Sequence, residues 1–331
     1  MVENRILFSI VVPVYNRPEE LDELLESLSH QGVRGFEVIV VDDGSTRRCD
    51  EVCAKWETIG AFPLRYEWQQ NTGPAGARNR AALDPALRGD YILFLDSDCI
   101  APPNYLYFTQ HWVGESGWVD LWGGPDAFMK SFTVKQKAIS YAMTSPLTTG
   151  GIRGGGERAT KFYPRTFNMG VRREAFRQVG GFTSDMRYGE DVDLSMRLVE
   201  QGFRSALFPD LFVYHKRRTT FGAFFRQVFH SGGARVDLSR RHKGSLKLVH
   251  LLPAIGVVLL ILGMLIPVTN FQEAVFALAL LYALLVGLHA TYRFRSPRLG
   301  GLAILACAVM MLGYGLGYLS SLLGLAGREE G

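Results

Sequence analysis

The sequence predicts an α/β domain built on a mostly parallel sheet, followed by a C-terminal bundle of three transmembrane helices. Over roughly the first two-thirds of the chain, short apolar runs alternate with segments whose leucines recur at helical spacing, a pattern typical of a parallel sheet covered by helices. From Leu248 onward, nearly every residue is apolar, Gly or Ser. We therefore expect an α/β domain at 1–215, a basic amphipathic segment at 216–247 and a transmembrane region at 248–331.

The N-terminal part of the chain alternates predicted strands and helices. Ile6–Val14 is a nearly continuous apolar run, as expected for a parallel strand that is covered on both faces. Pro18 suits the first turn of a helix, and Gly32 is placed to end that helix. No periodicity is evident in Pro125–Pro164, where Thr149–Gly156 is predicted to form a mobile loop. Further strands are predicted at Phe36–Val41, Leu64–Trp68 and Tyr91–Leu95, and further helices at Arg48–Ile59 and from Pro74 through Leu87.

Three apolar stretches close the chain, and each approaches or exceeds the length of about 20 residues that a spanning helix needs. They cover roughly 248–268, 274–292 and 299–326. The first connection contains no Lys or Arg, whereas the second contains Arg293, Arg295 and Arg298. Because positively charged connections stay in the cytosol, we expect a multi-pass protein of the plasma (inner) membrane with a cytosolic N-terminal domain and its C-terminus outside.

Two acidic residues follow the fourth predicted strand. Asp96 and Asp98 are separated by Ser97, and carboxylates at that spacing on an extended chain point the same way. Hard divalent cations typically bind one or two carboxylates plus phosphate oxygens. The pair therefore indicates a metal site that neutralises a departing diphosphate. The alternative is a solvated turn or a helix cap.

Asp42 and Asp43 end the second predicted strand, in the sequence Asp-Asp-Gly-Ser. Ligands of open α/β sheets bind outside the carboxyl ends of the strands, so both acidic strand ends are expected on one rim. There the carboxylates would accept hydrogen bonds from a base N–H or from ribose hydroxyls. The alternative is an Asp-Gly turn that caps the next helix.

A third acidic group, Glu190 and Asp191, opens a predicted helix after Gly189. Acidic residues at a helix start commonly interact with the helix dipole. The functional alternative is a general base that deprotonates an acceptor hydroxyl. His215, which follows an apolar run, is either structural or, as a neutral imidazole, a metal ligand beside Asp98.

Six short motifs follow one another along the chain: VPVYNR at Val12–Arg17, VDDGS at Val41–Ser45, GPAGARN at Gly73–Asn79, DSD at Asp96–Asp98, FNMG at Phe167–Gly170 and GEDVDL at Gly189–Leu194. Taken in this order, they make the chain similar to the family-two glycosyltransferases, which have the GT-A fold. The resemblance covers about residues 6–230. It implies a nucleotide-sugar-binding domain, a divalent metal (Mn²⁺ or Mg²⁺), and direct displacement that inverts the anomeric carbon and needs one base.

The resemblance also implies roles for individual residues. Asp191 is expected to be the catalytic base, and Glu190 supports it or is itself the base. Asp98 is expected to bind the metal directly, Asp96 to face the ribose and the metal, and His215 is the further candidate ligand. The residues expected to contact the nucleotide-sugar are Pro13, Tyr15, Asn16, Asp42, Asp43, Arg78, Asp96 and Ser97.

One motif of the family is missing. Processive polysaccharide synthases carry Gln-x-x-Arg-Trp after the acidic base, whereas the corresponding segment Phe225–His230 reads FRQVFH. With three spans, this predicts a nonprocessive, hexosyltransferase-like enzyme of polysaccharide biosynthesis that acts on a lipid-linked or other glycan acceptor. One alternative is sugar transfer to polyprenyl phosphate, with Arg217 and Arg218 as candidate phosphate ligands. The other is a noncatalytic membrane scaffold with a sugar-transferase fold.

The segment 216–247 contains nine Lys or Arg residues and one acid. Its phenylalanines fall at helical spacing, which predicts an amphipathic helix at the membrane surface. An anionic leaflet attracts each nearby basic residue by about 1 kcal/mol. Because the segment adjoins a spanning helix, membrane binding is favoured and no nucleic-acid partner is expected. In the last span, Gly313 and Gly317 are predicted to pack against another helix.

Overall fold

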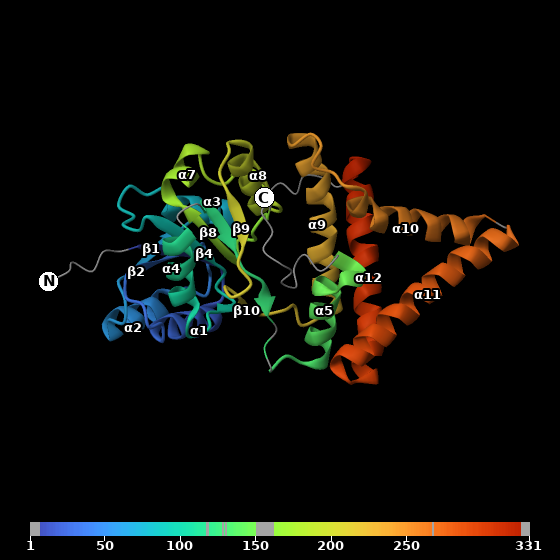
Figure 1. Cartoon of the computed structure of the whole chain (residues 1–331), viewed down its shortest axis with the longest axis horizontal. Coiled ribbons are helices and arrows are strands. Elements are labelled where there is room, and N and C mark those ends of the chain that lie inside the picture. Colours follow the sequence, from blue (N-terminus) through green and yellow to red (C-terminus); the bar gives the residue numbers. More distant parts are fainter. Residues whose placement is uncertain are drawn as a thin grey trace. The chain divides into compact units, whose positions relative to one another are not determined.

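The computed structural model describes residues 7–116, 119–127, 129, 131–149, 162–266 and 268–325. The chain forms two compact units, and Figure 1 shows the elements of each. The first unit comprises residues 1–129 and 154–216, and the second comprises 130–153 and 217–331. The chain therefore crosses from one unit to the other after residues 129, 153 and 216.

A large sheet forms the centre of the first unit. Its strands are β1 (Phe8–Val14), β2 (Phe36–Asp43), β3 (Leu64–Gln69), β4 (Tyr91–Leu95), β6 (Leu121–Gly123), β8 (Asn168–Arg172) and β9 (Ser205–Leu207). The strand order is β3-β2-β1-β4-β8-β6-β9, and β1 is parallel to both β2 and β4. β8 runs antiparallel to β4 and β6. The mostly parallel sheet is confirmed, and the carboxyl ends of β1, β2 and β4 meet at one edge.

A smaller sheet combines three short strands that are far apart in the sequence. They are β5 (Cys99–Ile100), β7 (Asp126–Ala127) and β10 (Val213–His215). β10 is antiparallel to β5, and this pairing sets His215 opposite Cys99. The residue after Asp98 is thereby fixed beside the predicted histidine ligand.

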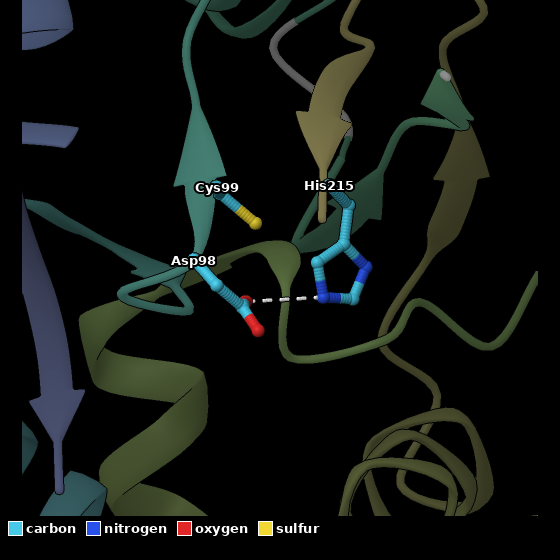
Figure 2. Close-up of side chains that lie close together, drawn as sticks. All are labelled: Asp98, Cys99 and His215. Carbon is cyan, nitrogen blue, oxygen red and sulfur yellow. Dashed lines mark ion pairs between the residues drawn. The ribbon is translucent and has the colours of Figure 1, made fainter. Parts of the chain in front are cut away.

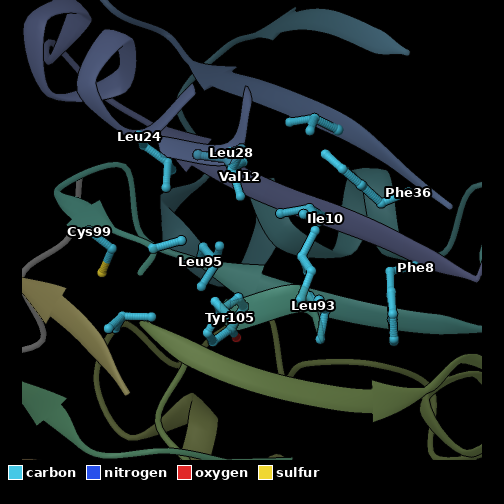
Figure 3. Packing of buried hydrophobic residues seen from close by; sticks show 14 of the residues in the cluster. Phe8, Ile10, Val12, Leu24, Leu28, Phe36, Leu93, Leu95, Cys99 and Tyr105 are labelled. Carbon is cyan, nitrogen blue, oxygen red and sulfur yellow. The ribbon is translucent and has the colours of Figure 1, made fainter. Parts of the chain in front are cut away.

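Helices cover both faces of the large sheet. They are α1 (Pro18–Ser29), α2 (Asp50–Ile59), α3 (Gly73–Ala82), α4 (Tyr105–Ser116), α7 (Arg173–Gln178) and α8 (Glu190–Glu200). Successive residues of a strand point to opposite faces. Ile10 and Val12 therefore pack with Leu24 and Leu28 of α1 in one buried cluster (Figure 3), whereas Val11 belongs to a second cluster with residues of α3, α7 and α8.

The helix predicted to run through Leu87 ends at Ala82 instead. Asp84 precedes Pro85, and a residue before proline is disfavoured in the helical region. The Asp84 carboxylate also accepts a hydrogen bond of 2.8 Å from the Ala86 N–H, which stabilises a turn. The predicted end of this helix is wrong because the turn at Asp84 and Pro85 stops the helix before Leu87.

The second unit begins with a helix that periodicity did not reveal. α5 (Val134–Thr144) starts at Thr133, whose side chain accepts a hydrogen bond of 3.2 Å from the Gln136 N–H. The Gln136 side chain accepts in return from the Thr133 N–H, so the sequence Thr-x-x-Gln forms a capping box. A short helix, α6 (Pro146–Thr149), follows. Most of the loop predicted at Thr149–Gly156 lies outside the described residues.

Three helices of the second unit are long and apolar enough to cross a membrane, as predicted. They are α10 (Leu248–Leu265), α11 (Thr269–Phe294) and α12 (Pro297–Leu322). α11 begins five residues earlier than expected, so the connection to α10 is very short. α12 begins with a proline in its first turn and is capped by the Ser296 side chain.

A basic helix, α9 (Phe221–Arg241), packs lengthwise against α12. A Cβ added to Gly317 would lie 1.9 Å from the carbonyl oxygen of Phe229, and Gly232 approaches the backbone of α12 almost as closely. Gly313 faces α9 as well, so the predicted packing of Gly313 and Gly317 is confirmed, with α9 as their partner. α12 covers part of the apolar face of α9, and the location of α9 at a membrane surface stays a prediction.

Candidate active site

Asn16 joins the loops that follow β1 and β2. Its backbone is in the left-handed region (φ 57°), which asparagine tolerates better than most residues. Its Oδ1 accepts a hydrogen bond of 2.9 Å from the Arg47 N–H, and its own N–H donates to Ser45 Oγ at 2.8 Å. Tyr15 is 51% exposed, which leaves its ring free for a ligand, and Pro13 lies in β1 beyond the last residue paired with β4.

The carboxylate of Asp42 is used within the protein. Asp42 is fully buried and accepts hydrogen bonds from the Ser45 N–H (2.9 Å), the Cys49 N–H (3.1 Å) and the Tyr66 hydroxyl (2.9 Å). These bonds engage both oxygens and hold the start of α2. The predicted contact between Asp42 and a nucleotide stays a prediction.

Asp43 caps the N-terminus of α3. Its Oδ1 accepts from the Thr72 N–H at 2.9 Å and from Gln69 Nε2 at 2.7 Å, and its Oδ2 accepts from the Gly73 N–H at 2.9 Å. The capping alternative is therefore correct for both residues: Asp42 holds the start of α2, the next helix along the chain, and Asp43 caps α3. The predicted contact of Asp43 with a base or ribose stays a prediction.

Arg78 connects two of the three acidic groups. It was expected to contact the nucleotide-sugar, but its side chain is only 4% exposed and lies between Asp96 and Glu190. Nη2 lies 2.7 Å from Asp96 Oδ1, and Nη1 lies 3.0 Å from Glu190 Oε1. These partners are 18 and 112 residues away in the sequence. The bridge fixes the end of β4 relative to the start of α8.

Glu190 and Asp191 open α8 after Gly189, whose φ is 82°. Burial raises the pKa of Glu190 to about 7, the neighbouring Asp191 adds to this effect, and Arg78 opposes it. Glu190 therefore changes charge near neutral pH, which suits a general base. Asp191 faces a cation instead, because Arg165 Nη1 lies 3.2 Å from its Oδ1. Both carboxylates stay candidates for the base.

Asp98, Cys99 and His215 form a cluster whose potential ligand atoms all lie within 4.8 Å of one another (Figure 2). His215 Nε2 lies 3.2 Å from Asp98 Oδ1. Two ligands on adjacent octahedral positions of an ion, each at about 2.1 Å from it, are about 3 Å apart, so the pair fits a divalent cation. Burial raises the pKa of Cys99, which keeps it a thiol and a poor ligand. Ser97, one residue before Asp98, is buried.

Sequence reasoning assigned no role to three residues around these carboxylates. Arg17 forms an ion pair with Asp98; burial alone would raise the pKa of Asp98, but His215 and Arg17 lower it. Phe167 stacks on the His215 ring, with centroids 4.8 Å apart. Arg17 and Phe167 belong to two of the motifs quoted above, so the sequence offered a reason to include them in the site. No comparable signal marks Arg165.

The family model described as Glycosyl transferase family 2 matches residues 9–180. The chain belongs to this family. The match contains the ends of β1, β2 and β4 and stops before α8, so the carboxylates of α8 are assigned to the site by their position in the structure.

Two relatives are similar to this family 2 chain in sequence. A pre-mycofactocin glycosyltransferase from Mycobacterium tuberculosis is 30% identical over 71% of the chain, which spans 48% of that relative's length. Succinoglycan biosynthesis protein ExoA from Rhizobium meliloti is 26% identical over 95% of the chain and 94% of its own length.

Among solved structures, mannosyltransferase PcManGT from Pyrobaculum calidifontis, in complex with GDP-Man and Mn²⁺, aligns with a TM-score of 0.61 at 19% identity. The alignment covers 96% of this chain and 87% of that one. S. aureus TarS 1–349 aligns over 96% of this chain and 92% of that one, with a TM-score of 0.50 at 20% identity. These similarities show that the family 2 chain has the GT-A fold.

Proposed function

We propose that the chain transfers a sugar, with inversion, from a nucleotide-sugar to a hydroxyl group of a lipid-linked glycan at the cytosolic face of a membrane. The Arg78 bridge is the observation that carries this proposal. It holds Asp96, at the carboxyl end of β4 where the nucleotide-sugar is expected, next to Glu190 at the start of α8. One edge thus combines acidic groups suited to the leaving group with acidic groups suited to the acceptor.

The proposed reaction is a single displacement. A carboxylate of α8 takes the proton of the acceptor hydroxyl, and the acceptor oxygen forms a bond to the anomeric carbon. The bond from that carbon to the diphosphate oxygen breaks, and its electron pair leaves with the nucleoside diphosphate. Asp191 is the base that the resemblance to family 2 implies, and Glu190, whose pKa of about 7 lets it accept a proton at neutral pH, is the competing base.

Asp98 and His215 are the residues that would hold a divalent ion, Mn²⁺ or Mg²⁺, with Asp96 close by. Such an ion offsets the charge of a leaving diphosphate. The Mn²⁺ and GDP-Man in the PcManGT complex support this assignment. Arg17, which pairs with Asp98, places a further positive charge at the same position.

The apolar helices and one relative support the choice of acceptor. α10, α11 and α12 are long and apolar enough for membrane insertion, and a lipid-linked acceptor would reach an enzyme held at the bilayer. The relative from Rhizobium meliloti that aligns over nearly its whole length is named for succinoglycan biosynthesis. Both facts favour an acceptor that belongs to a membrane-linked glycan pathway.

The test is an assay of the full-length protein in detergent. Release of nucleoside diphosphate is measured for UDP-, GDP- and dTDP-sugars, with Mn²⁺, Mg²⁺ or EDTA, and with lipid-linked glycans or polyprenyl phosphate as acceptor. We expect metal-dependent turnover of one donor class and a product of inverted anomeric configuration by NMR. Asp98→Asn should remove the activity, whereas Asp210→Asn, at an exposed position of the same unit, should not. No turnover of any donor would support the scaffold alternative.

A further inference from the structure

The three apolar helices of the second unit form a triangle (Figure 1). Each pair of helices meets at one corner, and each corner contains a glycine. An added Cβ at these glycines would lie within 3.1 Å of the neighbouring helix in every case. The corners are Gly315 of α12 against Pro253 of α10, Gly263 of α10 against Val275 of α11, and Gly287 of α11 against Ile304 of α12.

The sides of the triangle have similar lengths. At a rise of 1.5 Å per residue, the corners are about 15 Å apart along α10, about 18 Å apart along α11 and about 17 Å apart along α12. Near-equal sides require a large angle at every corner. Because spanning helices tilt by about 0–40° from the membrane normal, two sides of such a triangle can cross a bilayer, but the third then lies close to its plane.

The exposed surfaces distinguish α12 from the other two helices. In the most apolar 18-residue windows, 17% of α10 and 11% of α11 are buried, compared with 44% of α12. α10 and α11 therefore present apolar side chains nearly all round, as helices surrounded by lipid do. α12 exposes one stripe, in which Leu305, Leu312 and Leu316 are 38–47% exposed.

Charges on α9 identify α12 as the side that lies flat. α9 and α12 run in the same direction, and at their C-terminal ends Arg240 Nη2 donates a hydrogen bond of 3.4 Å to the Ser321 carbonyl oxygen. If α12 crossed the bilayer, α9 would cross with it and carry Arg226, Arg235 and Asp237 inside. Each such charge near the centre of a bilayer costs about 2.5–3.5 kcal/mol.

Basic residues lie at both ends of α12. Arg293, Arg295 and Arg298 surround its start and are exposed, and Arg240 and Arg241 lie beside its C-terminal end. The positive-inside rule places both groups on the cytosolic side, which a crossing helix would not allow. The connection between α10 and α11, at the opposite corner of the triangle, contains no Lys or Arg.

We propose that α10 and α11 cross the membrane as a hairpin, and that α12 lies along the cytosolic membrane surface beside α9. The partner of this surface is an anionic bilayer: the apolar stripe of α12 contacts acyl chains, and the basic groups at its two ends contact headgroups. Both ends of α12 are then on the same side. This arrangement has two spans and differs from the three spans and external C-terminus expected from the sequence.

The first test is cysteine labelling in sealed membrane vesicles with a maleimide that does not cross membranes. The full chain is used, since its four native cysteines are buried. Leu325→Cys and Arg295→Cys, at exposed positions beyond the two ends of α12, should label from the same side. Glu273→Cys, near the hairpin tip, should label from the other side. Opposite labelling of positions 325 and 295, or labelling of position 273 together with 295, would overturn the proposal.

The second test measures depth directly. Spin labels at Leu305, Leu312 and Leu316 should show equal collision rates with oxygen, because a helix in the membrane plane keeps one depth. Leu278 and Leu288 of α11 are the matched control: both are exposed, and they lie about 15 Å apart along the helix axis. These two labels should differ clearly in depth. A depth gradient along α12 as steep as that along α11 would refute the flat orientation.

Discussion

The Arg78 bridge predicts a loss of stability that depends on pH. Arg78→Met leaves Glu190 buried beside Asp191 without its cation, and breaking a buried ion pair in this way costs about 3–5 kcal/mol. In the folded protein Glu190 has a pKa of about 7, above its ordinary value of 4.5. The stability linked to this group is therefore complete below pH 4.5 and is lost as the pH rises through 7.

Arg78 lowers the pKa of Glu190, so its removal raises that pKa further and deepens the loss at alkaline pH. We expect the melting temperature of Arg78→Met to fall by roughly 10 °C at pH 8 and by clearly less at pH 5.5. The measurement is a thermal unfolding scan of the full chain in detergent. EDTA is included so that no metal alters the charge around Asp96.

The matched control is Arg80→Met, on the same helix. Arg80 is exposed and pairs with Glu67 at 2.8 Å, so its loss should cost at most about 1 kcal/mol at either pH. The double variant Arg78→Met/Glu190→Gln removes the buried charge together with its partner and should recover stability at pH 8. Equal losses for the two arginine variants, or no recovery in the double variant, would refute the reasoning.

Three further predictions concern the base, the metal and the helix contact. Asp191→Asn should lower turnover by about 10²–10⁴-fold with little change in nucleotide affinity, whereas Glu190→Gln should keep most activity. His215→Ala should raise the Mn²⁺ concentration for half-maximal activity by about tenfold or more. Gly317→Ala should destabilise the protein in thermal scans by about 1–3 kcal/mol, whereas Gly301→Ala, with no atom within 4 Å of the new Cβ, should be neutral or stabilising.

Each of these predictions has an opposing outcome. If Glu190→Gln loses turnover and Asp191→Asn keeps it, Glu190 is the base, and if neither variant is impaired, no base acts at the start of α8. An unchanged Mn²⁺ dependence in His215→Ala would remove His215 from the metal site. Equal stability of Gly317→Ala and Gly301→Ala would mean that the close approach of α9 and α12 carries no strain.

The edge of the sheet was predictable because it depends on local patterns. The apolar run Tyr91–Leu95 predicts a strand, and parallel strands of one sheet have their carboxyl ends at the same edge. Asp96 and Asp98, which follow this strand, were therefore expected at the same edge as the carboxyl end of β2. Arg78 was not predictable in the same way. The family resemblance implied contact with a ligand, and only packing between segments 112 residues apart shows that Glu190 is its partner.

In the second unit, too, local patterns were predictable and contacts between distant segments were not. Length and composition correctly predicted three long apolar helices, because the summed apolar character of a segment is a local property of the sequence, but they do not decide which of α10, α11 and α12 cross the membrane. The direction of α12 relative to α9 depends on backbone contacts at Gly313 and Gly317, which a hydropathy pattern does not contain. The sequence contains the capping box of Thr133 and Gln136 that starts α5, but α5 was not predicted because the residues around this motif lack helical periodicity.

The division of the chain determines how this protein can be shortened for experiments in water. Residues 130–153 belong to the helical unit although both neighbouring segments belong to the sheet-containing unit. In α5, Ala138, Ile139, Tyr141 and Ala142 pack in a cluster with residues of α11 and α12. A truncation after residue 216 would therefore leave this apolar surface uncovered and prone to aggregation. A water-soluble catalytic fragment needs the segment 130–153 replaced by a polar linker as well.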